Sequence, residues 1–296
     1  MFSSLSFSPQ LVLSQLVVGL VNGSFYAILS LGLAIIFGML NVINFVQGAL
    51  FMTGAFVGYF LLQLAGIDYL YALFLTPIIV AGIGFLIERF LLSRIYKIDH
   101  IYGWLLTFGL ALMIESIFRQ FYGVSGRPYP VPTWLRGTID LGFMMLPIYR
   151  AWVILVSSIG CLATWYAIEK TQLGSYLRAS TENPQMTRCF GINVPWLICI
   201  TYCCGVGMAA FAGVLAAPIY QVSPLMGSNI IVVIMAVVVI GGLGSILGTI
   251  ITGISIGLIE GIAKIIYPEG SHVIIFIIMA IVLIVKPTGL FGKRIR

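Results

Sequence analysis

The feature that most constrains this chain is the absence of charge over long stretches. Residues 1–67 contain no Asp, Glu, Lys or Arg, and residues 189–259 form a second uncharged stretch, with shorter ones at 69–87 and 151–168. A helix needs about 20 apolar residues, each rising about 1.5 Å, to cross about 30 Å of hydrocarbon. Each long stretch therefore holds two or three membrane spans.

The composition excludes a soluble protein and favours helices over strands. Only 8% of the residues are charged, against about 25% in soluble domains. The apolar runs are continuous and lack the alternation that a transmembrane barrel requires. We predict an all-α, polytopic transmembrane bundle of eight to ten spanning helices, with residues 1–296 forming one domain. The expected spans are 10–28, 29–45, 47–66, 70–90, 101–119, 147–168, 193–217, 228–245, 248–265 and 273–286.

The basic residues predict the orientation. If Arg89 faces the cytoplasm, alternation of the ten spans places ten basic residues on that side and five elsewhere, as the positive-inside rule requires. Both termini are then cytoplasmic. The ten are Arg89, Arg94, Lys97, Lys170, Arg178, Arg188, Lys286, Lys293, Arg294 and Arg296.

Three polar residues interrupt the first uncharged stretch. Asn41, Asn44 and Gln47 recur every three residues, so they either share one helix face or cap a break in the helix. Non-helical backbone at membrane depth is tolerated where it is buried in protein or lines a cavity, as in transport proteins. We therefore consider these residues candidates for a translocation pathway. A short interfacial turn is the alternative.

Two acidic residues precede a basic residue by four positions, Glu115 before Arg119 and Glu260 before Lys264. Such spacing favours an ion pair on a helix, which would make burial of the charges tolerable. The other interpretation is a solute or proton path, to which Glu115 is a candidate contributor. Glycines four apart, such as Gly253, Gly257 and Gly261, indicate close helix packing.

The sequence lacks the motifs of an enzyme. His100 and His272 stand singly, and no HExxH, GxSxG or phosphate-binding GxxxxGK[ST] motif occurs, so the chain cannot hydrolyse ATP alone. The five cysteines have no CxxC spacing, and we expect neither a metal nor a cofactor. The outer loop, at about 120–146, is rich in proline and predicts a connector with extended structure and turns.

The longest inner loop, at about 169–192, contains a short helix with complete start and stop signals. Asn183 is a good N-cap, Pro184 suits the first helical position, and Gly191 suits the position after the end. Met186 and Phe190 are four residues apart and share one face with Cys189.

An isolated short helix needs a surface to pack against. That surface is either the protein's own inner face or a cytoplasmic partner, and the polar flanks Arg178, Glu182 and Arg188 favour a partner. Such a coupling helix could pass a partner's motion into the membrane.

The chain resembles the permeases of branched-chain amino-acid ABC importers, the LivH type, over nearly its whole length. Four ordered blocks carry the resemblance. The first block comprises residues 22–27, 36–38, 44–48 and 52–54, and the second comprises Ala179, 182–184, Met186 and 191–193. The third is 241–245 with Gly248, and the fourth is 286–292.

The resemblance implies an inner-membrane permease subunit that pairs with a second, identical or distinct, permease, two cytoplasmic ATP-binding subunits and a periplasmic solute-binding protein. It implies bacterial location, no catalysis by this chain and no nucleic-acid partner. The second block resembles the family's segment that docks on the ATPase. Branched-chain or related amino acids are the implied solutes, and urea or short amides are those of related members.

Three positions depart from the family pattern. Members often carry a His and then an acidic residue where this chain has Gln47 and Ala49, and often a Lys where it has Val233. These departures leave the solute open. Three other functions remain as alternatives: a stand-alone secondary transporter or channel, a lipid-modifying enzyme, and a purely structural subunit. The shortage of intramembrane ionisable groups disfavours the transporter or channel.

Overall fold

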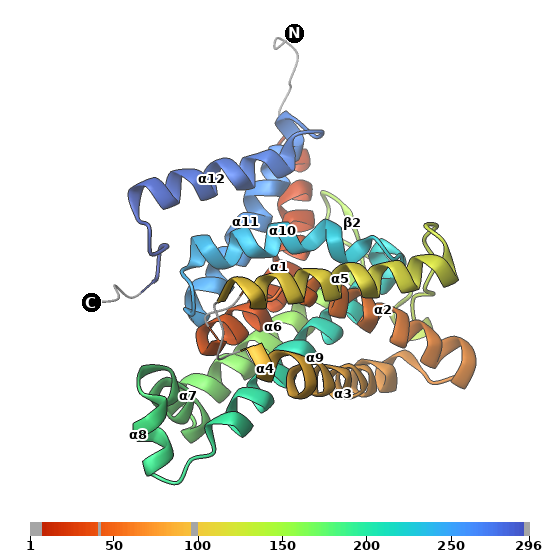
Figure 1. Cartoon of the computed structure of the whole chain (residues 1–296). Coiled ribbons are helices and arrows are strands. Elements are labelled where there is room, and N and C mark those ends of the chain that lie inside the picture. Colours follow the sequence, from red (N-terminus) through yellow and green to blue (C-terminus); the bar gives the residue numbers. More distant parts are fainter. Residues whose placement is uncertain (1–7, 41–42, 96–99, 293–296) are drawn as a thin grey trace.

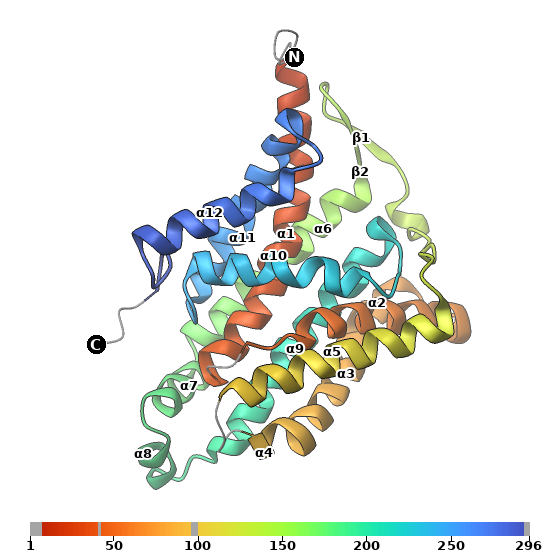
Figure 2. The same ribbon diagram turned by 45° about the horizontal axis from the view of Figure 1, so that its top comes forward.

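The computed structural model describes residues 8–40, 43–95 and 100–292 and shows a bundle of helices (Figures 1 and 2). The membrane-embedded helices are α1 (Pro9–Leu40), α2 (Val46–Ala65), α3 (Tyr69–Ile87), α5 (His100–Tyr122), α6 (Ile148–Glu169), α9 (Val194–Tyr220), α10 (Met226–Gly241), α11 (Ile246–Ile266) and α12 (Ser271–Val285). The remaining elements are a π-helical turn (Glu88–Leu92), α4 (Ser93–Ile95), a 3₁₀ turn (Thr133–Leu135), β1 (Thr138–Asp140), β2 (Met145–Pro147), α7 (Gln172–Glu182) and α8 (Pro184–Cys189).

The predicted all-α polytopic fold is confirmed. Within the described residues, seven helices are long and apolar enough to cross a membrane, and α10 and α12 are shorter apolar helices. Together they number nine, within the predicted eight to ten. The chain turns sharply after α10 because Gly242 and Gly244 have φ angles of +104° and +81°, which L side chains rarely adopt. Helix α12 ends at Val285, where Lys286 precedes Pro287.

The prediction of two separate spans at 10–28 and 29–45 is wrong, because α1 is one helix of 32 residues. Such a helix is about 48 Å long, more than the hydrocarbon thickness requires. Its middle lies inside the protein, where every residue from 23 to 36 is buried, so bilayer thickness does not limit its length. Asn41 lies outside the described residues.

Helix α1 packs most closely against α11, through glycines on both helices. A Cβ atom added to Gly257 would lie 2.3 Å from the Cα of Gly23, and one added to Gly19 would lie 2.6 Å from the Gly257 carbonyl oxygen. Helices α2 and α9 meet in the same way, since a Cβ on Gly54 would lie 2.5 Å from the Cα of Ala210. The predicted role of the glycine repeats in helix packing is confirmed.

The bundle has two different ends (Figure 2). Helix α6 starts beside the β1–β2 hairpin and leads to α7 and α8 at the opposite end. The outer loop is a connector with extended structure and turns, as predicted, and Arg127 and Val222 form a two-hydrogen-bond bridge that ties it to the end of α9. In this loop, burial raises the pKa of Tyr129 to about 12, so its hydroxyl stays neutral at physiological pH.

The glycine contacts predict a large cost for added volume at one position. Gly257→Val should force α1 and α11 apart and destabilise the fold by about 1–3 kcal/mol, the usual cost of overpacking. The unfolding midpoint of the purified protein in detergent measures this. Gly82→Val is the matched control, because Gly82 is an exposed helical glycine with nothing within 4 Å of an added Cβ. Equal midpoints for the two variants would contradict the packing argument.

Candidate functional site

The break between α1 and α2 carries two of the predicted pathway residues, and both are buried. Asn44 Nδ2 donates to the Tyr202 hydroxyl at 3.4 Å, and Gln47 Nε2 donates to the Gly205 carbonyl at 3.0 Å. Both acceptors belong to the middle of α9. The chain is not helical at 43–45, but Asn44 and Gln47, the latter in the first turn of α2, turn their side chains into the protein and do not cap a helix end.

Small residues allow this approach of three helices. A Cβ on Gly32 of α1 would lie 2.8 Å from both the Gln47 Nε2 and the Gly205 carbonyl oxygen. Gln47 is fully buried, and its Oε1, like the Oδ1 of Asn44, has no hydrogen-bond partner among the described residues. Buried polar atoms lower the stability of a fold unless they are hydrogen-bonded. The single hydrogen bond that each amide donates is therefore important for the stability of this region.

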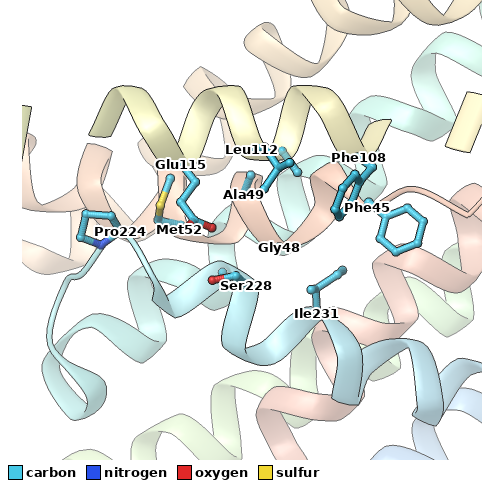
Figure 3. A pocket seen from close by; sticks show the side chains of 12 residues that line it. Phe45, Gly48, Ala49, Met52, Phe108, Leu112, Glu115, Pro224, Ser228 and Ile231 are labelled. Atoms are coloured by element: carbon cyan, nitrogen blue, oxygen red, sulfur yellow. The ribbon is translucent and has the colours of Figure 1, made fainter. Parts of the chain in front are cut away.

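A groove of about 410 Å³ lies directly beside this break, between α2, α5 and α10 (Figure 3). Helices α2 and α10 are in close contact at its base, because a Cβ on Gly48 would lie 2.6 Å from the Gly227 carbonyl oxygen. Its lining is mostly apolar. The lining residues are Phe45, Gly48, Ala49, Met52, Phe108, Ala111, Leu112, Glu115, Pro224, Gly227, Ser228 and Ile231.

Glu115 is the one ionisable residue of the groove lining. Its carboxylate and the Ser228 hydroxyl face the space between α5 and α10 from opposite sides (Figure 3). The expected Glu115–Arg119 ion pair is not formed, since the ion pairs among the described residues involve only Glu169 and Glu260. Glu115 therefore presents an uncompensated negative charge to the groove.

The other predicted pair is confirmed and belongs to a separate cluster. Lys264 Nζ lies 2.6 Å from Glu260 Oε1, the Tyr26 hydroxyl donates to Glu260 Oε2 at 2.6 Å, and His272 Nδ1 lies 3.9 Å from Oε1. Glu260 is only 1% exposed. The cluster joins α1 to α11 near the start of α12, and its charges are neutralised internally, which makes burial of the carboxylate tolerable.

The three family departures lie in different surroundings. Gln47 is buried against α9, Ala49 lines the groove, and Val233 is buried near Tyr26 and Ile275. Among them only Ala49 is placed to contact a solute in the groove.

The short helix predicted in the inner loop is present as α8, with the predicted ends, and its coupling role stays a prediction. Asn183 Oδ1 accepts a hydrogen bond from the Met186 N–H at 3.0 Å, Pro184 is the first helical residue, and Gly191 has φ of +82°. Among the described residues nothing covers its apolar face, since the side chains of Phe190 and Met186 are 83% and 60% exposed.

The flanking polar residues lie around this helix as expected. Glu182 and Arg188 are exposed, and Arg178 lies 3.6 Å from Glu169 across the turn between α6 and α7. Helix α7 itself, within the loop at 169–192, was not predicted. Thr171 stands immediately before its first residue, and Leu173, Tyr176 and Leu177 recur at the spacing of one helix face, so a signal for this helix was present in the sequence.

The sequence alone did not reveal the groove. Its walls come from three helices that are distant in sequence, and Phe108, Ser228 and Ile231 are ordinary residues of apolar spans. The one available signal was Glu115, an acid inside an apolar run. Across the described parts of the chain, no three His, Cys, Asp or Glu side chains converge as a metal site would need.

These observations define a class: a multi-pass helical membrane protein with an open polar-apolar groove and an exposed capped helix at one end. Comparison with known proteins makes the class specific. Residues 15–283 match the family model described as the permease component of the branched-chain amino acid transport system. The chain therefore belongs to this permease family, and it is a membrane subunit of the ABC importer type.

Individual relatives agree. The chain is 28% identical to the high-affinity branched-chain amino acid transport system permease protein LivH of Salmonella typhimurium and 27% identical to BraD of Pseudomonas aeruginosa. Each alignment covers 95% of this chain and 96% of the relative. The ribose import permease protein RbsC of Escherichia coli is 31% identical over 47% of this chain and 40% of its own length. No solved structure matches the chain.

The hydrogen bond from Gln47 predicts a structural role that can be measured. Gln47→Met keeps the volume and removes the donor to Gly205, so the hydrogen bond between α2 and α9 is lost and the free energy of unfolding should fall by about 0.5–1.5 kcal/mol. Thermal unfolding of the purified protein measures this. Gln63→Met, an exposed glutamine on the same helix, is the control and should leave the midpoint unchanged. A midpoint for Gln47→Met equal to that of the control would contradict the role.

Proposed function

We propose that residues 1–296 act as one permease domain and form half of a transmembrane pathway in an ATP-driven importer. The other parts are a second permease, identical or distinct, two cytoplasmic ATP-binding subunits and a periplasmic solute-binding protein. Chemistry resides in the ATP-binding subunits, and this chain is not an enzyme. The observation that carries the proposal is the uncovered apolar face of α8.

Helix α8 has six residues, too few to be stable without packing. Met186 and Phe190 nevertheless point away from the rest of the chain. Large apolar side chains gathered on a projecting helix mark a binding surface, and the polar flanks Arg178, Glu182 and Arg188 fit the rim of a protein interface. The partner that this surface fits best is the ATP-binding subunit, to which Asn183, Pro184 and Gly191 present α8 in a fixed direction.

The pathway runs along the groove, on the face that α5 exposes. Of the seven long helices α5 is the least buried, with 11% of its span inside the protein. A carboxylate facing hydrocarbon costs about 2.5–3.5 kcal/mol or more, so Glu115 requires a neighbour that is not lipid. A second permease packed on this face would enclose the groove and supply that neighbour.

The predicted pathway residues then divide into two roles. Glu115 lines the path, whereas Asn44 and Gln47 position its wall, because they fix the break that delivers Phe45, Gly48 and Ala49 to the groove. Asn41, outside the described residues, stays a candidate from the sequence. The names of the relatives point to branched-chain amino acids as the solutes, and the apolar walls suit aliphatic side chains.

The orientation follows from α8. If α8 meets an ATP-binding subunit, its end of the bundle is cytoplasmic. Leu290 and Phe291 form backbone hydrogen bonds with the last turn of α10. Gly244, which follows that turn, lies against Gly38 near the end of α1. The tail is therefore cytoplasmic, as predicted from the basic residues.

The beginning of α1 lies on the opposite side. Tyr220, at the hairpin end of α9, donates to Asn22 at 2.6 Å, whereas Gly205, further toward α8, lies against Gly32. Helix α1 therefore runs from the hairpin end toward the α8 end. We place its first residues on the periplasmic side, which revises the expectation that both termini are cytoplasmic, because that expectation counted α1 as two spans.

The coupling proposal predicts the effect of charge on α8. Met186→Asp and Phe190→Asp together should abolish binding of the ATP-binding subunits and lower ATP-dependent uptake by at least tenfold, because two carboxylates would enter an apolar interface. Co-purification and uptake by reconstituted complexes measure both effects.

The control for this experiment is Gln185→Asp, which adds charge to the same helix and leaves Met186 and Phe190 in place. It should assemble normally. Unaltered recruitment and uptake in the double variant would refute the docking role of α8, and uptake by this chain alone, without ATP, would identify a secondary transporter or channel.

The orientation proposal predicts a labelling pattern in intact spheroplasts. A membrane-impermeant maleimide should modify Ser8→Cys from outside and Lys286→Cys only after permeabilisation. Ser8 precedes the first residue of α1, whereas Lys286 lies in the tail that is bonded to the end of α10, beside the last turns of α1. Protection of both introduced cysteines in intact spheroplasts would restore the orientation expected from the sequence.

A further inference from the structure

The polar groups that face the groove are all hydrogen-bond acceptors. Glu115 contributes a carboxylate that has no ion-pair partner among the described residues. Ser228 donates its own hydroxyl proton to the Leu225 carbonyl at 3.0 Å, so its oxygen is left to accept. A group bound between them must therefore donate hydrogen bonds, and the charge of Glu115 favours a cation.

The rest of the groove fits an aliphatic chain. Met52, Phe108, Leu112 and Ile231 supply apolar surface around the two acceptors. The groove is thus lined by apolar side chains, with one carboxylate among them.

An alkylammonium group has the complementary chemistry. It has three donors, no acceptor and a full positive charge, and a charge-assisted bond to a carboxylate is roughly twice as strong as a neutral one. Urea and amides also donate hydrogen bonds, but they leave the carboxylate charge uncompensated in a poorly solvated site. The groove therefore distinguishes solutes by charge as well as by shape. The carboxylate of an amino acid finds no donor side chain in this lining, so it faces the open side of the groove, where we place the second permease.

We propose that Glu115 accepts the ammonium group of the transported solute, so that the groove passes aliphatic amino acids in preference to neutral amides. This inference rests on the proposed function and adds the solute class and the residue that selects it. The binding protein sets the affinity of capture, and Glu115 provides a second selection inside the membrane.

The first test measures uptake of L-leucine by the complete reconstituted importer. Glu115→Gln keeps the size and removes the charge, and it should lower uptake by about tenfold or more, the equivalent of losing one hydrogen bond to a charged group. Glu115→Asp should retain a larger share of the uptake. The ATPase activity of the complex should stay within twofold, because a purely structural defect would impair assembly and ATPase activity together.

Glu269→Gln is the control, since this acid is exposed in the turn between α11 and α12. It should behave as the unmodified protein. If the wild-type complex takes up leucine and the Glu115→Gln complex takes it up equally well, the inference is overturned and the proposed function is not. Absence of ATP-dependent leucine uptake by the wild-type complex would overturn the proposed function itself.

A second test detects binding without the binding protein. Ser228→Cys places a thiol in the groove, and its labelling by N-ethylmaleimide is followed by mass spectrometry of the peptide. L-leucine and 3-methylbutylamine should slow labelling, whereas 3-methylbutanamide, with the same carbon skeleton and no charge, should not. Adding Glu115→Gln should remove the protection. Equal protection by amine and amide, or none by leucine because lipid fills the groove, would overturn the inference.

Discussion

The architecture depends on close approach of helix backbones. Lipid tails are as apolar as the side chains, so burial of hydrocarbon gives helices in a bilayer little reason to associate, and packing contacts must hold them together. Here the contacts are between glycines. Gly19, Gly23 and Gly257 bring α1 and α11 into backbone contact, and Gly54 does the same for α2 and α9. Because α1 is enclosed by these neighbours, it holds the other helices in place and can exceed the length of a simple span.

The same closeness makes the break after α1 possible. A gap in a helix leaves peptide groups unpaired, which hydrocarbon does not tolerate. Gly32 and Gly205 remove side chains from the spot where Gln47 enters, and Gln47 then binds the carbonyl of Gly205. The first turn of α2 is thereby held beside α10, and the groove lies where α5 covers the two only in part. The glycine packing and the groove are consequences of one arrangement.

What the sequence could and could not predict follows from the range of the interactions. The coupling helix was predicted with its ends because Asn183, Pro184 and Gly191 act within one turn of their own backbone. Membrane spans were predicted wherever charges or prolines bounded them, but nothing local in 9–40 marks the chain as one helix, since only its enclosure by α9 and α11 allows that length. The groove was out of reach for the same reason: Met52, Phe108 and Ile231 become neighbours only in the folded bundle. Glu115 could be singled out, but its predicted partner Arg119 is not the group it faces.

Helix α9 connects the two functional regions. It begins three residues after Gly191, is capped by the Asn193 side chain at the Trp196 N–H, and reaches Gly205 about 17 Å further on. In the proposed importer, a displacement of α8 by an ATP-binding subunit would therefore be delivered to the residue that holds Gln47, without passing through a flexible loop. It would shift the break and with it Phe45, Gly48 and Ala49 in the groove wall. A solute bound as we propose, by one carboxylate and apolar contacts and not by a closed set of hydrogen bonds, would lose its site when the wall moves, and weak binding of this kind allows release in each cycle.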